Sequence, residues 1–371
     1  MTTWFTSADC HLEDFRTVVE QQTDKSAFPH ATDVVQNVLV YSGDLPDTTE
    51  VRAELARALM DGPGIVVFRG AFATDVVDRA TDVFAGLIAD QKAAGAVGGD
   101  HFAKPGANDR VWGALDKFAL RDPAAFATYY DNDTLALISA AWLGAGYQVT
   151  SQVNVVNPGG QAQVAHRDYH LGFMSADQSS RFPAHVHQLS PVLTLQGAVA
   201  HVDMPVETGP TLYLPHSQKY APGYLAFHQP SFTEYFNAHH EQLPLSKGDA
   251  AFFNPALFHG AGTNRSADVR RMANLLQISS AFGRAMETVD RTAMCEALYP
   301  TLLAYEGSTA TVVAASAEGY AFPTNLDRDQ PIGGLAPQTQ AELMRQALAE
   351  RWDPATFTKA LHDQANRRSA A

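Results

Sequence analysis

The strongest constraint on the fold of this chain is a series of short strand-like segments between residues 146 and 282. In the first of them, polar residues that include Gln152 and Asn154 alternate with small or β-branched ones. A period of two residues is typical of a strand whose two faces meet different surroundings. Clusters of glycine, proline and asparagine separate the segments, and this punctuation favours a jelly roll or a sandwich. The further strand candidates are residues 163–171, 192–204, 210–217, 243–255 and 270–282.

The parts of the chain on either side of these segments have helical periodicity. Apolar residues recur at helical spacing before residue 62 and after residue 74, and one β-branched run, residues 65–70, predicts a strand between them. Amphipathic patterns return near the C-terminus. We therefore expect one α+β domain over residues 1–371, with a helical part that has one strand (1–145), a jelly-roll core (146–282) and a second helical part (283–371).

Composition excludes several classes of protein. The chain has 40 acidic and 26 basic residues, a formal net charge of −14, which argues against nucleic acid or an anionic membrane as a partner. Its two cysteines, Cys10 and Cys295, do not have the spacing of a disulfide framework or a CxxC motif, which favours a reducing compartment. We see no secretory signal at the start and no apolar run of membrane-spanning length, so we expect a cytoplasmic protein.

The segment VAHRDYHLGF places three possible metal ligands, His166, Asp168 and His170, at alternate positions. On a strand, side chains two residues apart lie roughly 6.6 Å from one another on the same face, so His166 and Asp168 can share one metal ion. His166 and His170 would be roughly 13 Å apart and cannot share it unless the strand ends or bends. A third ligand must therefore come from elsewhere.

His259 is the candidate for that third ligand, because it follows a predicted strand and opens a glycine-rich turn in NPALFHGAGTNRS. Two histidines and one carboxylate with open coordination positions form the facial triad of non-haem Fe(II) oxygenases. Arg270 and Arg271 begin the next strand candidate. A co-substrate such as 2-oxoglutarate, which chelates iron at one end, needs a cation for its far carboxylate, and the planar guanidinium group suits that task.

Four sequence motifs together resemble the phytanoyl-CoA dioxygenase family of 2-oxoglutarate oxygenases over roughly residues 55 to 280. They are NPGGQAQVAHRD, ETGPTLYLPHSQ, GDAAFFNPALFHGAGTNRS and VRR, in the order that the family has them. The resemblance implies a double-stranded β-helix, a form of jelly roll. It also implies that His166, Asp168 and His259 bind iron and that Arg270, by its offset from the distal histidine, binds 2-oxoglutarate.

Other residues are candidates for supporting roles. Neighbours on a strand point to opposite faces, so only one of Arg270 and Arg271 can bind the co-substrate, and we favour Arg270. A serine common in the family two residues after the distal histidine is Ala261 here, and Thr263 could replace its hydrogen bond. The sequence of residues 174–188 indicates a loop that could cover a substrate. The candidate cofactor-binding residues are Arg270, Gln152, Asn154 and Thr263, and the candidate substrate-binding residues are His170, Arg181 and His185.

These features predict an Fe(II)- and 2-oxoglutarate-dependent dioxygenase that uses O2 to hydroxylate an unactivated C–H of a small molecule, releasing succinate and CO2. Related halogenases replace the carboxylate ligand with a small residue, so Asp168 favours hydroxylation or another oxidation. Two alternatives stay open. One is a cupin-like isomerase or hydrolase that uses zinc on the same roll, and the other is a non-catalytic binding protein. The pattern predicts neither the substrate, which could be an acyl-CoA, a secondary metabolite or a small polar metabolite, nor the oligomeric state.

Overall fold

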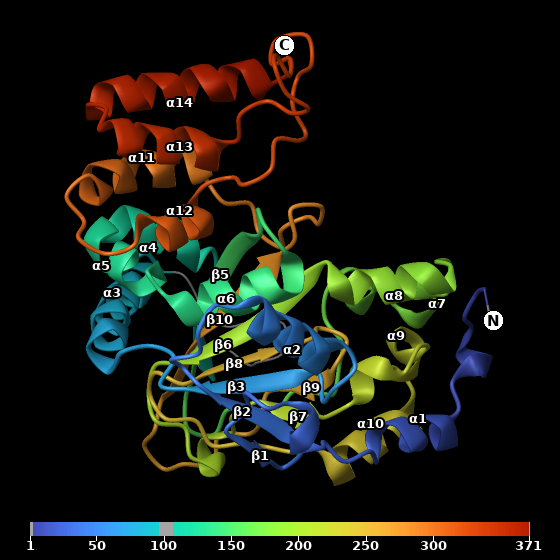
Figure 1. Cartoon of the computed structure of the whole chain (residues 1–371). Helices are drawn as coiled ribbons and strands as arrows, with labels where there is room; N and C mark the ends of the chain where they lie inside the picture. Colours follow the sequence, from blue (N-terminus) through green and yellow to red (C-terminus); the bar gives the residue numbers. More distant parts are fainter. Residues whose placement is uncertain (1–2, 96–106, 371) are drawn as a thin grey trace.

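The computed structural model describes residues 3–95 and 107–370, and a β-sheet roll with helices packed on its outside occupies most of that part (Figure 1). The strands are β1 (Asp33–Val35), β2 (Val38–Ser42), β3 (Ile65–Arg69), β4 (Asn108–Val111), β5 (Gln148–Val156), β6 (Thr194–Ala200), β7 (Leu212–Leu214), β8 (Ala250–Phe253), β9 (Phe258–Gly260) and β10 (Arg271–Ser279).

Eight of these strands form one large sheet in the order β1-β2-β3-β8-β6-β10-β5-β4. Its neighbouring strands are antiparallel except β2 and β3, which are parallel and are joined by a helical crossover. A small second sheet pairs β7 with β9, and isolated bridges extend it at His166–His259 and Tyr213–Glu241. The two sheets face one another as a double-stranded β-helix, which confirms the predicted α+β jelly roll.

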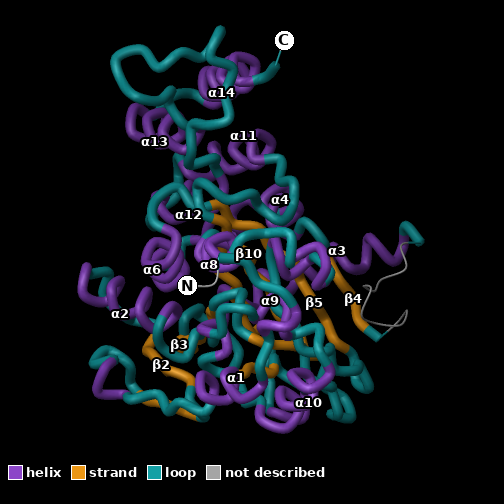
Figure 2. The backbone as a smooth tube through the Cα atoms, turned by 90° about the vertical axis from the view of Figure 1, so that its right-hand side faces the viewer, coloured by secondary structure: helices purple, strands orange, loops and turns teal. Residues whose placement is uncertain are grey.

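Helices cover the outer faces of both sheets and continue away from the large one. They are α1 (Leu12–Val19), α2 (Thr49–Met60), α3 (Thr74–Ala93), α4 (Ala114–Arg121), α5 (Pro123–Tyr130), α6 (Asp133–Leu143), α7 (Ala176–Ser179), α8 (Ala184–Val192), α9 (Gly223–Ala226), α10 (Pro230–His239), α11 (Arg291–Leu302), α12 (Thr309–Ser316), α13 (Gln340–Glu350) and α14 (Pro354–Arg368). In both views α14 lies farthest from the sheet, and α11 and α13 lie between α14 and the sheet (Figures 1 and 2).

The alternation in β5 is explained by the two environments of the strand. Val149, Val153 and Val155 belong to the main apolar core, which also contains side chains from α4, α5, α11 and α12. Gln152 and Asn154 point the other way, into a cavity inside the roll. The sheet is therefore apolar where it meets helices and polar where it lines the cavity, as a jelly roll with an internal site requires.

The prediction of a single strand before residue 145 was wrong, because β1, β2, β3 and β4 all lie there. β1 and β2 form a hairpin whose two turn residues, Gln36 and Asn37, have positive φ angles of 50° and 64°. Such angles are required by the tight two-residue turns of hairpins, and asparagine tolerates them. The polar pair between two valine-rich runs was the sequence signal for this hairpin.

None of the helices in the described ranges is long and apolar enough to cross a membrane.

Candidate metal centre and its cavity

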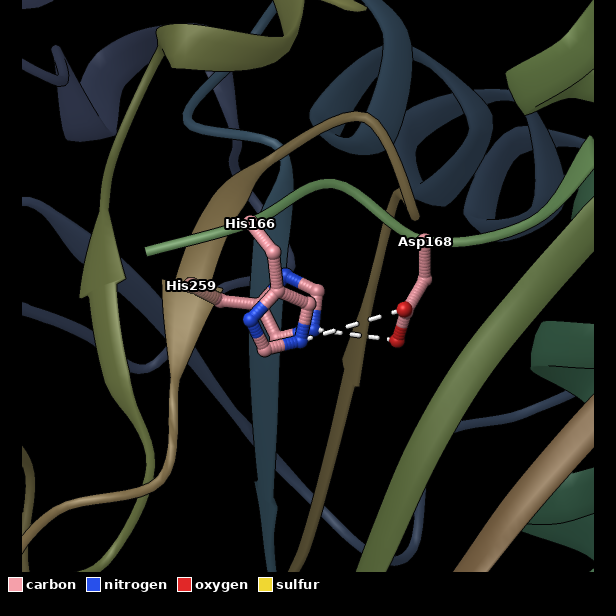
Figure 3. Close-up of side chains that lie close together, drawn as sticks. All are labelled: His166, Asp168 and His259. Atoms are coloured by element: carbon pink, nitrogen blue, oxygen red, sulfur yellow. Dashed lines mark ion pairs between the residues drawn. The ribbon is translucent and has the colours of Figure 1, made fainter. Parts of the chain in front are cut away.

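Two antiparallel segments bring the candidate ligands together. His166 and His259 lie opposite one another and exchange both backbone hydrogen bonds, N···O 2.9 and 3.1 Å. On the same pair of segments, the N–H of Asp168 donates to the carbonyl of Pro255. The two imidazoles and the carboxylate consequently point toward a common centre (Figure 3).

The backbone fixes the orientation of both imidazoles. The Nδ1 of His166 lies 2.8 Å from the carbonyl oxygen of Val164, and the Nδ1 of His259 lies 2.9 Å from that of Leu257. A carbonyl can only accept, so each Nδ1 carries the proton and each Nε2 carries the lone pair that can bind a metal. A ligand histidine commonly has such a partner, because it fixes the tautomer that binds the metal.

Asp168 lies close to the Nε2 atoms of both histidines. Its Oδ1 is 3.8 Å from the Nε2 of His166, and its Oδ2 is 3.3 Å from the Nε2 of His259. The Nε2 of Gln196 also donates to Oδ2 over 2.5 Å. Burial alone would raise the pKa of the Asp168 carboxyl, but the positive charge that His166 and His259 carry when they are protonated, together with the hydrogen bonds from His259 and Gln196, outweighs burial and holds the pKa below its ordinary value. The carboxylate is thus kept in the charged form that a metal ligand needs.

The three side chains fit a divalent metal of the iron type. Their ligand atoms all lie within 4.8 Å of one another, close enough to meet one ion at about 2.0–2.2 Å each. Two imidazoles and one carboxylate on one side of the ion would leave its other coordination positions open, as in facial-triad oxygenases. Within the described ranges this is the one group of three or more possible ligands. The open side faces a cavity of about 660 Å³.

His170 does not join this centre. The chain turns at Tyr169 and His170, whose φ angles are 63° and 44°, and then enters a short 3-10 helix. The Nδ1 of His170 lies 3.2 Å from the hydroxyl of Ser190, on α8, and His170 is not part of the cavity wall. Our assignment of His170 to substrate binding was therefore wrong, because the turn carries its ring away from the site.

The preference for Arg270 over Arg271 was also wrong. Arg270 is exposed on the outside, where it pairs with Asp109 at 2.8 Å and bonds to Asn157. Arg271 is buried, lines the cavity, and donates through Nη1 to the carbonyls of Thr208 and Gly262 at 3.3 Å. β10 begins at Arg271. Side chains along a strand alternate between its two faces, so Arg271 faces the cavity and its neighbour Arg270 faces outward.

Arg271 presents an uncompensated positive charge to the cavity. No carboxylate in the described part of the chain pairs with it, and its Nε and Nη2 donate to no described residue. Burial lowers the pKa of its guanidinium to about 10, which still leaves it charged at neutral pH. A buried cation without a partner is costly, so this position is suited to an anion that enters from the cavity.

Gln152 and Asn154 line the cavity as predicted, whereas Thr263 does not. The Oδ1 of Asn154 is buried without a hydrogen-bond partner. The Thr263 hydroxyl instead accepts a hydrogen bond from the N–H of Ala162 and ties two loops together, so its assignment to the co-substrate was wrong. Ala261, the position of the missing serine, does line the cavity.

The segment 174–188 is largely helical rather than a loop, and of its residues Met174 and Ser175 line the cavity. It contains α7 and the start of α8, and it turns Arg181 and His185 outward, where both are exposed. Arg181 pairs with Asp177 on the protein surface at 2.6 Å. Neither residue lines the cavity, which contradicts the prediction that they bind substrate.

Sequence reasoning missed several residues that do line the cavity. Gln196 and Gln277 come from β6 and β10, and the outer walls are apolar or aromatic. The alternation in β10 was a usable signal: Met272, Leu276 and Ile278 belong to the outer core, so Arg271 and Gln277 had to share the other face. The apolar wall residues are Trp112, Phe173, Met174, Phe227 and Met286.

The fold and the triad define a jelly-roll protein with an internal candidate metal centre of the facial type. A family model described as phytanoyl-CoA dioxygenase (PhyH) matches residues 60–272, more than half of the chain. The chain belongs to this family. A search of curated proteins finds no match.

Several solved structures are similar to part of this chain. EvdMO1 has 17% identity and a TM-score of 0.44, and the match covers 62% of this chain but only 50% of that one, so this chain matches about half of its length. SnoN, a non-haem α-ketoglutarate-dependent epimerase of nogalamycin biosynthesis, has 20% identity and a TM-score of 0.39 over 61% of this chain and 82% of its own. SnoK, a carbocyclase of the same pathway, has 20% identity and a TM-score of 0.44 over 64% and 85%.

Proposed function

We propose that this protein is an Fe(II)- and 2-oxoglutarate-dependent dioxygenase that uses O2 to hydroxylate an unactivated C–H of a small molecule, with release of succinate and CO2. The observation that carries the proposal is the pairing of two features in one cavity: a facial set of ligands and a buried arginine without a carboxylate partner among the described residues. Family membership supports it, because the family is named for a dioxygenase.

The roles of the chain's own residues follow from their positions. His166, Asp168 and His259 would hold the iron, which supplies the redox chemistry with O2 when bound. Arg271 would bind the far carboxylate of 2-oxoglutarate through its unused N–H groups. Its Nη1 touches the carbonyl of Gly262, three residues after His259, which places the cation roughly 10 Å along the strand from that ligand. A short diacid can bridge such a distance.

The cavity walls also shield the reacting groups in part from bulk water. The apolar walls Phe173, Met174 and Phe227 stand beside the triad, and Phe253 packs its ring edge on His259 at 4.8 Å between centroids. Dry surroundings strengthen the contact between the Arg271 guanidinium and a carboxylate. They also limit side reactions of whatever forms at the metal.

The proposal is tested by following succinate from 2-oxoglutarate with purified protein, Fe(II) and ascorbate, without added substrate. We expect slow succinate formation that is lost in His166→Ala. If no succinate forms and calorimetry detects no 2-oxoglutarate binding, the zinc-dependent isomerase or hydrolase and the non-catalytic binding protein become the better explanations. Neither of these alternatives explains why a buried Arg271 faces the cavity.

The type of binding partner and the cellular location are also proposals. We propose a small-molecule substrate rather than nucleic acid or a membrane, because the formal net charge is −14 and the candidate site is an internal cavity. We propose a cytoplasmic location, because Cys10 and Cys295 are both free thiols.

A further inference from the structure

Three glutamines form a continuous polar strip on the cavity side of the large sheet. Gln196 on β6, Gln277 on β10 and Gln152 on β5 all line the cavity, and each is less than one-tenth exposed. The three strands are adjacent in the order β6-β10-β5. Gln196 and Gln277 are directly opposite one another in the register, so their Cβ atoms are roughly 5 Å apart. We call these three residues the glutamine strip.

The hydrogen-bonding groups of the glutamine strip are only partly satisfied. Gln152 is fully engaged: its Nε2 donates to the Oε1 of Gln277 over 3.3 Å, and its Oε1 accepts from Arg110 over 3.1 Å. The Nε2 of Gln277, in contrast, donates to no described residue. The Oε1 of Gln196 is buried and has no partner among the described residues, although its Nε2 bonds to Asp168. On these facing residues, one buried acceptor, the Gln196 Oε1, and one donor at the cavity, the Gln277 Nε2, therefore have no partner among the described residues.

Unsatisfied buried amide groups are costly, and a strip that served only to fill the core would use apolar side chains instead. A group that bonds to both the Gln196 Oε1 and the Gln277 Nε2 has to donate one hydrogen bond and accept another. A hydroxyl group does both, whereas a carboxylate only accepts and an ammonium only donates.

The glutamine strip is separate from the proposed 2-oxoglutarate position but close to the metal centre. Arg271 and Gln277 are six residues apart on β10, which corresponds to roughly 20 Å along the strand. Gln196 touches Asp168, so the strip begins beside the ligands and extends away from Arg271. A molecule bound on the strip would therefore lie next to the metal without displacing the co-substrate.

The charges around the strip favour an uncharged ligand. Arg110 is the basic residue near it among the described cavity residues, and it is engaged by Gln152 and lies 4.6 Å over the Trp112 ring. Arg167 also lines the cavity, but its Nη2 is engaged by the carbonyls of Ser217 and Tyr220. The acidic residue of the described wall is the ligand Asp168 itself.

We infer that the glutamine strip is the substrate-recognition subsite and that it takes an uncharged molecule with hydroxyl groups on an otherwise apolar frame. The hydroxyl bridges Gln196 and Gln277, and the apolar frame rests on Trp112 and Met286 at the outer wall. The adjoining carbon is thereby held beside Asp168. This inference rests on the proposed function, since it assigns the second ligand of the same cavity. It also argues against an acyl-CoA, whose phosphates need several free cations.

Binding of three probes that share one ring tests the inference. The protein is loaded with Ni(II) in place of iron and saturated with 2-oxoglutarate, so that Arg271 is occupied and no turnover occurs. Ligand-observed NMR titrations then compare trans-1,2-cyclohexanediol, cyclohexanecarboxylate and cyclohexylammonium. We expect the diol to bind about tenfold or more tightly than either charged probe, the ratio that roughly one additional hydrogen bond provides.

Two variants of Gln277 sharpen the test. Gln277→Leu should reduce the preference for the diol to within a factor of about three, because it removes the donor and leaves the rest of the cavity in place. Gln277→Glu keeps the shape but adds a negative charge, and it should shift the preference toward cyclohexylammonium. Gln346→Leu, on the exposed side of α13, is the matched control and should bind the probes as the wild type does.

The affinity for 2-oxoglutarate, measured by calorimetry on the same samples, separates the two proposals. If the wild type does not bind 2-oxoglutarate, the proposed function fails. If 2-oxoglutarate binds normally but a charged probe equals the diol, the inference about the strip is overturned while the proposed function stands. The inference about the strip is also overturned if Gln277→Leu binds 2-oxoglutarate normally and keeps the full preference for the diol.

Discussion

A polar cluster lies on each side of the large sheet, and the two clusters differ in how completely their groups are paired. On the helix side, both ring nitrogens of His201 are engaged, Nδ1 with the Thr81 hydroxyl at 2.8 Å and Nε2 with the Tyr129 hydroxyl at 3.0 Å. On the cavity side, His166 and His259 are anchored to the backbone through Nδ1 and direct Nε2 toward Asp168.

This difference distinguishes a structural histidine from a ligand histidine. Burial lowers the pKa of His201 to about 3, so it is a neutral core residue with both hydrogen bonds made inside the protein. Among the described residues, the cavity-side groups include an unpaired guanidinium on Arg271 and unsatisfied amides on Gln196 and Gln277. Groups that the protein leaves unpaired in a cavity are the ones that a ligand can complete.

The largest effect is expected from Asp168→Ala. This variant removes the charged ligand of the triad, and we expect succinate formation to fall to the level of the protein-free reaction. Iron binding, measured by titration, should weaken with it. Asp177→Ala is the control, because Asp177 pairs with Arg181 on the surface, and it should keep full activity. Iron-dependent turnover that persists in Asp168→Ala would refute the assignment of the triad.

The next largest effect should separate the two neighbouring arginines. Loss of one partner from a buried charged pair typically costs about 2–5 kcal/mol, so Arg271→Leu should raise the KM for 2-oxoglutarate by about a hundredfold. Arg270→Leu should change this KM by less than about threefold, because an exposed ion pair contributes little and Lys92 also pairs with Asp109. A larger effect from Arg270→Leu would mean that Arg270, and not Arg271, binds the co-substrate.

On the helix side, the expected effect is on stability and depends on pH. The unfolded chain protonates His201 near its ordinary pKa of 6.5, but the folded chain does so only near 3. The stability from neutral His201 is therefore complete above pH 6.5 and is lost as the pH falls toward 3. The slope is about 1.4 kcal/mol per pH unit.

Urea denaturation at pH 6.5 and at pH 5 measures this slope in the free energy of unfolding. His201→Gln cannot take up the proton, so its loss of stability over the interval should be smaller than that of the wild type by about 2 kcal/mol. Equal losses in the two proteins would show that His201 becomes protonated in the folded state.

The smallest effect is expected from Tyr129→Phe. The Tyr129 hydroxyl contacts His201 and accepts a hydrogen bond from the Nδ2 of Asn274, so its removal should lower the free energy of unfolding by about 1–3 kcal/mol. The KM for 2-oxoglutarate should stay at the wild-type value. A changed KM would mean that the two sides of the sheet are coupled. The helix-side cluster would then not be purely structural.

The sequence predicted the roll and the trio of candidate ligands because both depend on local patterns. Alternation with turn clusters identifies strands, and a His-x-Asp pair places two ligands on one side of an extended segment. It could not give the phase of β10 from the Arg270–Arg271 pair alone, since either neighbour can face inward. The phase is given by the alternation farther along β10, where Met272, Leu276 and Ile278 belong to the outer core.

The substrate side of the site could not be predicted, because it depends on where the chain turns after Asp168. The positive φ angles of Tyr169 and His170 turn the His170 ring away from the cavity and place Phe173 and Met174 at its wall, and these angles are unusual for residues other than glycine. Gln196 and Gln277 meet only through the pairing of β6 with β10. A single sequence contains no direct signal for such a contact.

The packing of Phe15 limits which part of the chain can be transplanted as a separate module. Phe15, on α1, is fully buried and its ring lies 5.0 Å from that of Phe258, the residue that precedes the ligand His259. The family match begins only at residue 60. The matched region is therefore not an interchangeable module: a chimera that transplants residues 60–272 alone would expose the back of the strand that positions the distal histidine.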